Sequence, residues 1–180
     1  MKRLITELPL ASAMLACVVS IAPTAAAQSN AASSLMPLDG ANQLQTHILL
    51  DCHRASSSCD FTAGANTLSP DGSVSGFPAG LWARQTTEIR PTSRVAYLDV
   101  HANGQFERIM KEGGSNTMTT VYFGDGPPDK YQTTGVIDAT SWSTGQAKTD
   151  FNVIACTHIQ VVYPGVNITS PSTCAQATFS

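Results

Sequence analysis

The feature that most constrains the fold is an alternation between short runs of β-branched and aromatic residues and clusters of turn-forming residues. Turn clusters stand at residues 69–72, 113–116 and 124–128. No stretch carries a long apolar repeat of helical period. Short strands punctuated in this way are typical of sandwiches and barrels. The chain is therefore predicted to be all-β, an antiparallel β-sandwich or flattened barrel of about seven to nine short strands.

Five segments show the strand pattern clearly. They are residues 46–50, 81–89, 118–123, 133–139 and 151–163. In the last of these segments both alternating faces are largely apolar, as expected of a strand that is covered on both sides or changes face at a bulge. We expect residues 151–163 to form the central strand, ended by Tyr163-Pro164-Gly165.

A hairpin is predicted around Asn103-Gly104, which separates the alternating runs 95–102 and 105–110. Asn-Gly between such runs favours a two-residue turn, because both positions tolerate a positive φ. The resulting register pairs Asp99 with Arg108, Leu98 with Ile109 and His101 with Phe106. The core face then holds Ala96, Leu98, Val100 and Ile109, and the other face holds Tyr97, Asp99, His101, Phe106 and Arg108.

The first 27 residues have the pattern of a secretory signal peptide. A basic start is followed by an apolar run from Leu8 to Ala22 and by three alanines that end at Ala27. Signal peptidase recognises small residues of this kind, so the mature chain is predicted to begin at Gln28 and to be secreted. A minor alternative is a lipid anchor at Cys17, because residues 14–17 loosely resemble a lipobox.

Beyond the signal peptide, composition predicts a flexible leader and then one domain. Residues 28–43 are rich in Ala, Ser, Asn and Gly, and residues 44–180 are long enough for a single β-rich extracellular domain. Four cysteines lie in that domain, namely Cys52, Cys59, Cys156 and Cys174. An even number in an exported chain favours two disulfides. Proximity favours Cys52 with Cys59 and Cys156 with Cys174, although spacing alone leaves all three pairings open.

Charge and hydropathy exclude two classes of partner. The chain carries 10 basic and 13 acidic side chains, a net charge of −3, without the clustered Lys and Arg that bind nucleic acid. No segment after the signal peptide approaches the roughly 18 apolar residues of a membrane span. The expected partner is an extracellular ligand, which the sequence leaves open among a protein, a glycan and a lipid.

Aromatic residues provide the best material for a binding surface. Trp82, Tyr97, Phe106 and Trp142 are the candidate binding residues, since flat rings beside polar groups suit sugars, peptides and protein partners. The competing interpretation is that Tyr97 and Phe106 fill the second side of the sheet. Trp142 lies near a turn and is the best candidate for an exposed ring.

Catalytic motifs are absent from the sequence, which favours a non-catalytic protein. No Gly-x-Ser-x-Gly motif and no metal-binding spacing of His or Cys occurs, so neither a cofactor nor a metal is predicted. The alternative is a small secreted hydrolase whose acids and bases converge only in the fold, and its candidates are Asp99, His101, Glu107 and His158. Asn167-Ile168-Thr169 also fits the N-glycosylation sequon.

Overall fold

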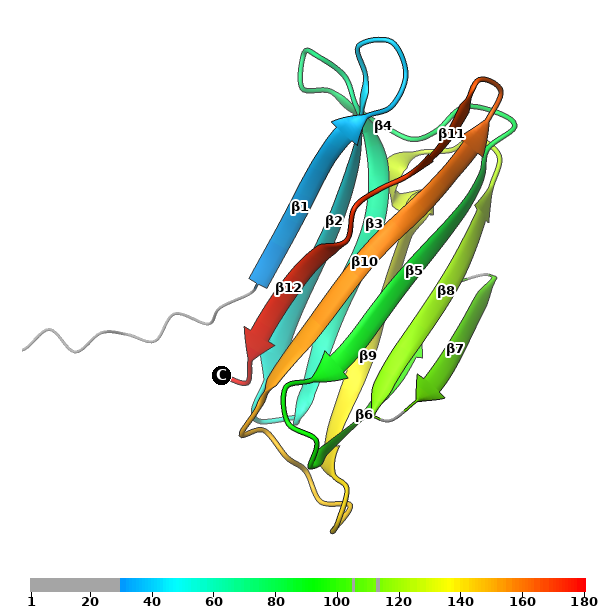
Figure 1. Cartoon of the computed structure of the whole chain (residues 1–180). Coiled ribbons are helices and arrows are strands. Elements are labelled where there is room, and N and C mark those ends of the chain that lie inside the picture. Colours follow the sequence, from blue (N-terminus) through cyan, green and yellow to red (C-terminus); the bar gives the residue numbers. More distant parts are fainter. Residues whose placement is uncertain (1–29, 105, 113) are drawn as a thin grey trace, which may run out of the picture.

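Two antiparallel sheets packed face to face form the protein, as expected of a β-sandwich (Figure 1). The computed structural model describes residues 30–180 apart from residues 105 and 113. The predicted signal peptide, with Cys17, lies outside the described residues. Within them, the all-β fold is confirmed, and it contains twelve strands where the sequence predicts about seven to nine.

The first sheet has the strand order β1-β2-β3-β9-β6, with the short β4 paired to β3. Its strands are β1 (Asn30–Pro37), β2 (Gln43–His53), β3 (Ser58–Leu68), β4 (Val74–Ser75), β6 (Ala96–Ala102) and β9 (Gln132–Ser141). One 3-10 turn, η1 (Pro128–Tyr131), leads into β9. The strands alternate buried and exposed residues, so one face of this sheet meets the core and the other faces solvent.

The second sheet has the order β11-β10-β5-β8-β7, and β12 pairs with the other half of β10 beside β11. Its strands are β5 (Trp82–Pro91), β7 (Glu107–Glu112), β8 (Ser115–Phe123), β10 (Asn152–Tyr163), β11 (Val166–Thr169) and β12 (Thr173–Thr178). The strand β10 therefore lies inside the sheet. Its core face carries Val153, Ala155, Ile159 and Val161, and its outer face is half-buried.

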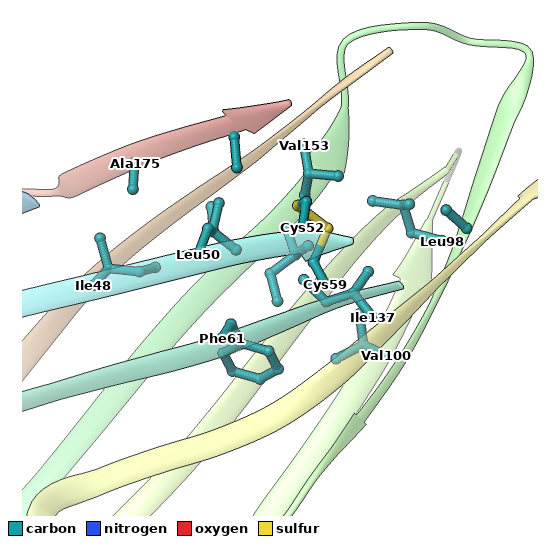
Figure 2. Close-up of a cluster of buried hydrophobic side chains, with 14 of the residues drawn as sticks. Ile48, Leu50, Cys52, Cys59, Phe61, Leu98, Val100, Ile137, Val153 and Ala175 are labelled. Atoms are coloured by element: carbon teal, nitrogen blue, oxygen red, sulfur yellow. A yellow bond between two sulfur atoms is a disulfide. The ribbon is translucent and has the colours of Figure 1, made fainter. Parts of the chain in front are cut away.

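The core consists of two apolar clusters, one toward each end of the sandwich. The larger cluster includes Ile48, Leu50, Phe61, Leu98 and Ile137 (Figure 2). The smaller cluster includes Leu44, Phe77, Tyr131, Ile159 and Val161. Along β2 and β10 the two clusters are separated by a buried threonine, Thr46 and Thr157 respectively, so a polar belt crosses the interior between them.

Hydrogen bonds within this belt satisfy most of its polar groups. The hydroxyls of Thr87 and Thr157 lie 3.0 Å apart, and the hydroxyl of Tyr122 lies 2.7 Å from that of Thr133. Gln85 on β5 donates its amide to the carbonyl of Ala63 on β3 at 3.1 Å, which ties one sheet to the other. Buried polar groups cost little when they are paired in this way.

The predicted hairpin at Asn103-Gly104 is wrong. The two strands form, but β6 pairs with β9 and β7 pairs with β8, so the chain crosses from one sheet to the other between them. Asp99 lies opposite Asp138 rather than Arg108. Neither Asn103 nor Gly104 has the positive φ of the expected turn. Instead, Asn103 continues the pairing with β9, donating its backbone N–H to Thr134 at 3.1 Å.

The predicted flexible leader contains an ordered strand. β1 occupies Asn30–Pro37 and pairs with β2 over its whole length, so regular structure is already present well before Leu44. The hydroxyls of Ser34, Thr46 and Thr173 lie 2.6 to 2.7 Å apart and join β1 and β2 to β12. The sequence does not indicate this strand, because its small and polar residues show no apolar alternation. β1 is an edge strand that contributes few side chains to the core.

Both favoured disulfides are present. Cys52 bonds to Cys59 and Cys156 bonds to Cys174, and each pair joins directly opposite residues of neighbouring strands. The first disulfide is buried in the larger apolar cluster (Figure 2), whereas the second lies on the outer face of the second sheet. Beside the first disulfide, Ser180 donates its N–H to the Cys52 carbonyl at 3.2 Å.

Candidate binding site

The four predicted aromatic residues lie toward the two ends of β6, in two groups. Trp82 and Phe106 belong to one group, together with Phe123. Tyr97 and Trp142 form the other group, with their ring centroids 4.7 Å apart. The strands β6 and β7 are edge strands of different sheets (Figure 1), and Tyr97 and Phe106 lie on or directly beside them, whereas Trp82 starts β5 inside the second sheet.

Phe106 and Phe123 of the first group border a groove of about 330 Å³, whereas Trp82 is not among its lining residues. Phe106, Val121 and Phe123 form its apolar wall, and Asn103, Lys130 and Gln132 contribute its polar part. Phe106 and Phe123 are 53% and 50% exposed, and their rings meet edge to face at 5.5 Å. Two half-exposed phenylalanines in contact leave apolar surface in water beside hydrogen-bonding groups, a combination that suits ligand binding.

Local backbone contacts hold the two phenylalanines in place. Val121 donates its N–H to the carbonyl of Phe106 at 3.0 Å, which extends the pairing of β7 and β8 by one residue and turns the Phe106 ring outward. Phe123 ends β8 opposite Trp82. Gly124 follows with a φ of 68° and donates to the Leu81 carbonyl at 2.9 Å, so β8 stops there. Both rings are thus attached to the sheet rather than to a free loop.

Below the rings, the groove rests on the buried polar belt. The Tyr122 hydroxyl contacts Thr133, and Thr133 donates in turn to Thr120 at 3.1 Å. Burial raises the pKa of Tyr122 to about 12, so this phenol stays neutral at physiological pH. Glu107 accepts a hydrogen bond from the Gly104 N–H at 2.8 Å and thereby fixes the crossover that carries Phe106.

The second aromatic group is joined to an ion pair that bridges the two sheets. Lys111 on β7 donates to Asp99 and, at 3.2 Å, to the Tyr97 hydroxyl, both on β6. Its ammonium lies 5.6 Å from the centroid of the Tyr97 ring. This hydrogen bond holds the pKa of Asp99 below its usual value and raises that of Lys111. The contact connects the edges of β6 and β7 through side chains.

The candidate catalytic residues are spread over different surfaces. Asp99 and His101 are neighbours on β6, with His101 Nε2 3.5 Å from Asp99 Oδ2 and 3.8 Å from Asp138. Glu107 is held by the crossover, and His158 lies on the outer face of the second sheet. Because Lys111 keeps Asp99 ionised, that carboxylate is poorly suited to act as a general acid. The four residues do not form one cluster.

Several residues of the groove and of the second aromatic group are not identified from the sequence. Phe123 was assigned to a strand but not to the binding surface, since a period-2 pattern does not say which strand end stays uncovered. Lys111 was missed because the hairpin register gave Asp99 a different cation as its partner. Lys130 reaches the groove from η1, a turn that has no strong sequence signal, and Gln132 reaches it from the first position of β9.

Other sequence features are placed as follows. Asn167 is exposed on the edge strand β11, where its Oδ1 accepts a hydrogen bond from Gln160 at 3.1 Å. Within the described residues, no three His, Cys, Asp or Glu side chains are grouped so as to hold a metal ion. The same part of the chain has no helix of the length and apolarity that crossing a bilayer requires.

Comparison with protein-family models, with curated proteins and with solved structures found no match to this chain.

Proposed function

We propose that this protein is secreted and non-catalytic, and that it binds a glycan in the groove beside Phe106 and Phe123. The observation that carries the proposal is a pair of half-exposed aromatic rings in a groove that is also lined by polar side chains. A sugar ring presents a flat C–H face and a rim of hydroxyls, so it needs an aromatic surface and hydrogen-bonding groups together.

The geometry of the groove suits a sugar in both respects. The two phenylalanine rings stand at 89° to each other and form a corner, in which one ring can stack on the sugar while the other flanks it. The Lys130 ammonium, which uses one N–H on the Asp125 carbonyl and has two more, and the Gln132 amide supply donors in the groove. The Asn103 Oδ1 already accepts a hydrogen bond from Thr134 at 3.0 Å, which leaves its NH₂ group to donate to a ligand.

The size and polarity of the groove favour a glycan over a lipid or a protein. A volume of about 330 Å³ is at the small end of ligand pockets, which begin at about 300 Å³. A lipid tail prefers a deep apolar cavity, whereas three of the six lining side chains named above, those of Asn103, Lys130 and Gln132, are polar. A stable protein interface buries about 800 Å² on each partner, far more than two phenylalanine rings provide.

An extracellular location is supported by the two disulfides, which persist in oxidising compartments. The signal-peptide pattern of residues 1–27 agrees with that location. The non-catalytic assignment is supported by the positions of Glu107 and His158, which lie apart from the neighbouring pair Asp99 and His101.

Calorimetric titration with a panel of neutral oligosaccharides tests the proposal. Suitable probes are hexamers of β1,4-glucose, β1,4-N-acetylglucosamine, β1,4-xylose and α1,6-mannose. We expect at least one of them to bind, and we expect Phe106→Ala and Phe123→Ala each to weaken that binding about tenfold, because a lost aromatic contact costs about 1–1.5 kcal/mol.

A matched control is Met110→Ala, which removes an equally exposed apolar side chain from the same face of β7, outside the groove. Its affinity should equal that of the wild type. Thermal unfolding of each variant confirms that it is folded. Equal affinity of all three variants and the wild type, or no binding of any panel member, would contradict the proposal.

A further inference from the structure

A second pocket, of about 250 Å³, lies at the opposite end of β6 from the groove. Its lining comes from the end of β5, the β5–β6 connection, the start of β6, Gly114 with the start of β8, and the segment after β9. The side chains that define it are Arg90, Pro91, Arg94, Ala96, Ser115 and Trp142. Two arginines and a tryptophan from separate elements thus meet in one concavity.

Trp142 is held in this pocket by a backbone hydrogen bond and a ring contact, and it lies close to Gly114. Its backbone N–H donates to the Val95 carbonyl at 3.0 Å, and its ring packs against Tyr97. Gly114 has a φ of 90°, and a Cβ placed there would lie 3.9 Å from the Trp142 ring. The ring is nevertheless 54% exposed. An exposed ring that is fixed before binding loses little entropy when a ligand stacks on it.

The two arginines give the pocket a positive character in a chain whose net charge is −3. The Arg90 Nε lies 3.9 Å from Glu88, a long contact between side chains that are each about half exposed, so this pair contributes little. A guanidinium presents two parallel N–H groups to a carboxylate or sulfate. The chemistry of the pocket is therefore that of a planar apolar surface beside anion-binding donors.

We propose that this pocket binds an acidic saccharide unit, with the sugar ring against Trp142 and its carboxylate or sulfate between Arg90 and Arg94. The sugar ring would stack on Trp142, and its anionic group would bind the two arginines. A neutral sugar or a simple anion would use only one of these two features of the pocket. The site is independent of the groove at Phe106, since the two pockets share no lining residue.

The test uses the two tryptophans of the chain as local reporters. Trp82 and Trp142 give two indole N–H signals in a ¹H–¹⁵N spectrum, and a Trp142→Phe variant assigns them. Titration with trigalacturonate should shift the Trp142 signal and leave that of Trp82 unchanged. The fully methyl-esterified trisaccharide, which has the same rings without the charge, should bind at least about tenfold more weakly.

Arginine variants then separate this site from general attraction of anions. Arg90→Gln and Arg94→Gln should each weaken trigalacturonate binding about tenfold, as expected for the loss of a charge-assisted hydrogen bond. The matched control Arg84→Gln removes an exposed arginine of β5 outside the pocket and should have no effect. Phe123→Ala should also have no effect, so failure of the groove proposal and failure of this one are distinguishable.

Three results would overturn the inference. The first is a Trp142 signal that trigalacturonate does not shift. The second is Arg84→Gln weakening binding as much as Arg94→Gln, which would indicate attraction to the whole surface. The third is inorganic sulfate binding as tightly as the trisaccharide and shifting the same signal, which would show an ion site without a saccharide component.

Discussion

The two disulfides should respond very differently to a reductant in the native protein. Cys52 and Cys59 are 1% and 0% exposed in the larger apolar cluster, whereas Cys174 is exposed on the outer face of β12 and Cys156 is half-buried. Nucleophilic attack on a disulfide, by a thiolate or by a phosphine, requires access to a sulfur atom. Reduction by a water-soluble phosphine should therefore cleave Cys156–Cys174 first and leave Cys52–Cys59 intact until the whole domain unfolds.

The stability lost in the first step can be worked out from the size of the closed loop. A sequence separation of 18 corresponds to about 3.2 kcal/mol of unfolded-state entropy, and a separation of 7 corresponds to about 2.4 kcal/mol. Domains of this size have a free energy of unfolding of about 5–15 kcal/mol. The singly reduced protein should accordingly remain folded, with its free energy of unfolding lower by about 3 kcal/mol.

The assay is alkylation of the thiols during native reduction, followed by peptide mass mapping, with urea unfolding of the singly reduced species. We expect alkylation at Cys156 and Cys174 well before any at Cys52 and Cys59. Equal rates at the two pairs, or earlier alkylation at the buried pair, would refute the reasoning from burial. Unfolding upon the first reduction would refute the estimated magnitude.

Two further changes test the arrangement of β6. Lys111→Gln should lower the free energy of unfolding by less than about 1 kcal/mol at neutral pH, since both partners are about 40% exposed. Because the pair lowers the pKa of Asp99, this stabilisation is present above the unfolded value of about 3.9 and is lost as the pH falls through the lower folded-state pKa. Urea unfolding across that pH range should show that the difference in free energy of unfolding between Lys111→Gln and the wild type vanishes in acid. Arg108→Gln should show no pH-dependent difference from the wild type. A pH-dependent loss in Arg108→Gln and none in Lys111→Gln would support the hairpin register instead. Gly135→Ala should cost about 1–3 kcal/mol or more in the same assay, because its Cβ would lie 2.2 Å from the His101 carbonyl oxygen. Gly145→Ala has open space and only backbone strain at a φ of 65°, so a larger loss there than at Gly135 would contradict the close approach of β6 and β9.

The strands that the sequence predicts are those with a clear pattern of burial. β5, β8, β9 and β10 each alternate buried residues with half-buried or exposed ones, because one face of each strand packs into the core. The disulfide pairing also follows from the sequence, since cysteines close along the chain lie opposite each other on neighbouring strands. The positions of these strands and the disulfide pairing can be predicted from the sequence because both depend on residues that are close together in the chain.

Features that depend on the pairing of distant segments were not predictable in this way. Asn103-Gly104 satisfies the local rule for a hairpin, but the apolar faces of β6 and β7 are better buried in opposite sheets, with Leu98 and Ile109 packed in the core from either side. β1 is not predicted from the sequence, because backbone pairing with β2 holds it in place and its side chains lack the apolar alternation that indicates a strand. The groove itself joins the crossover, the end of β8 and η1, which only the tertiary fold brings together.

The most direct test of the central claim is a map of backbone amide shifts in ¹⁵N-labelled protein titrated with the oligosaccharide that binds best in the panel. We predict that the perturbed amides cluster at residues 121–124 and 130–132 and at the crossover that carries Phe106, with the outer face of the first sheet unchanged. Saturable shifts centred on that outer face, or no saturable shift around Phe106 and Phe123, would contradict the assignment of the groove as the glycan site.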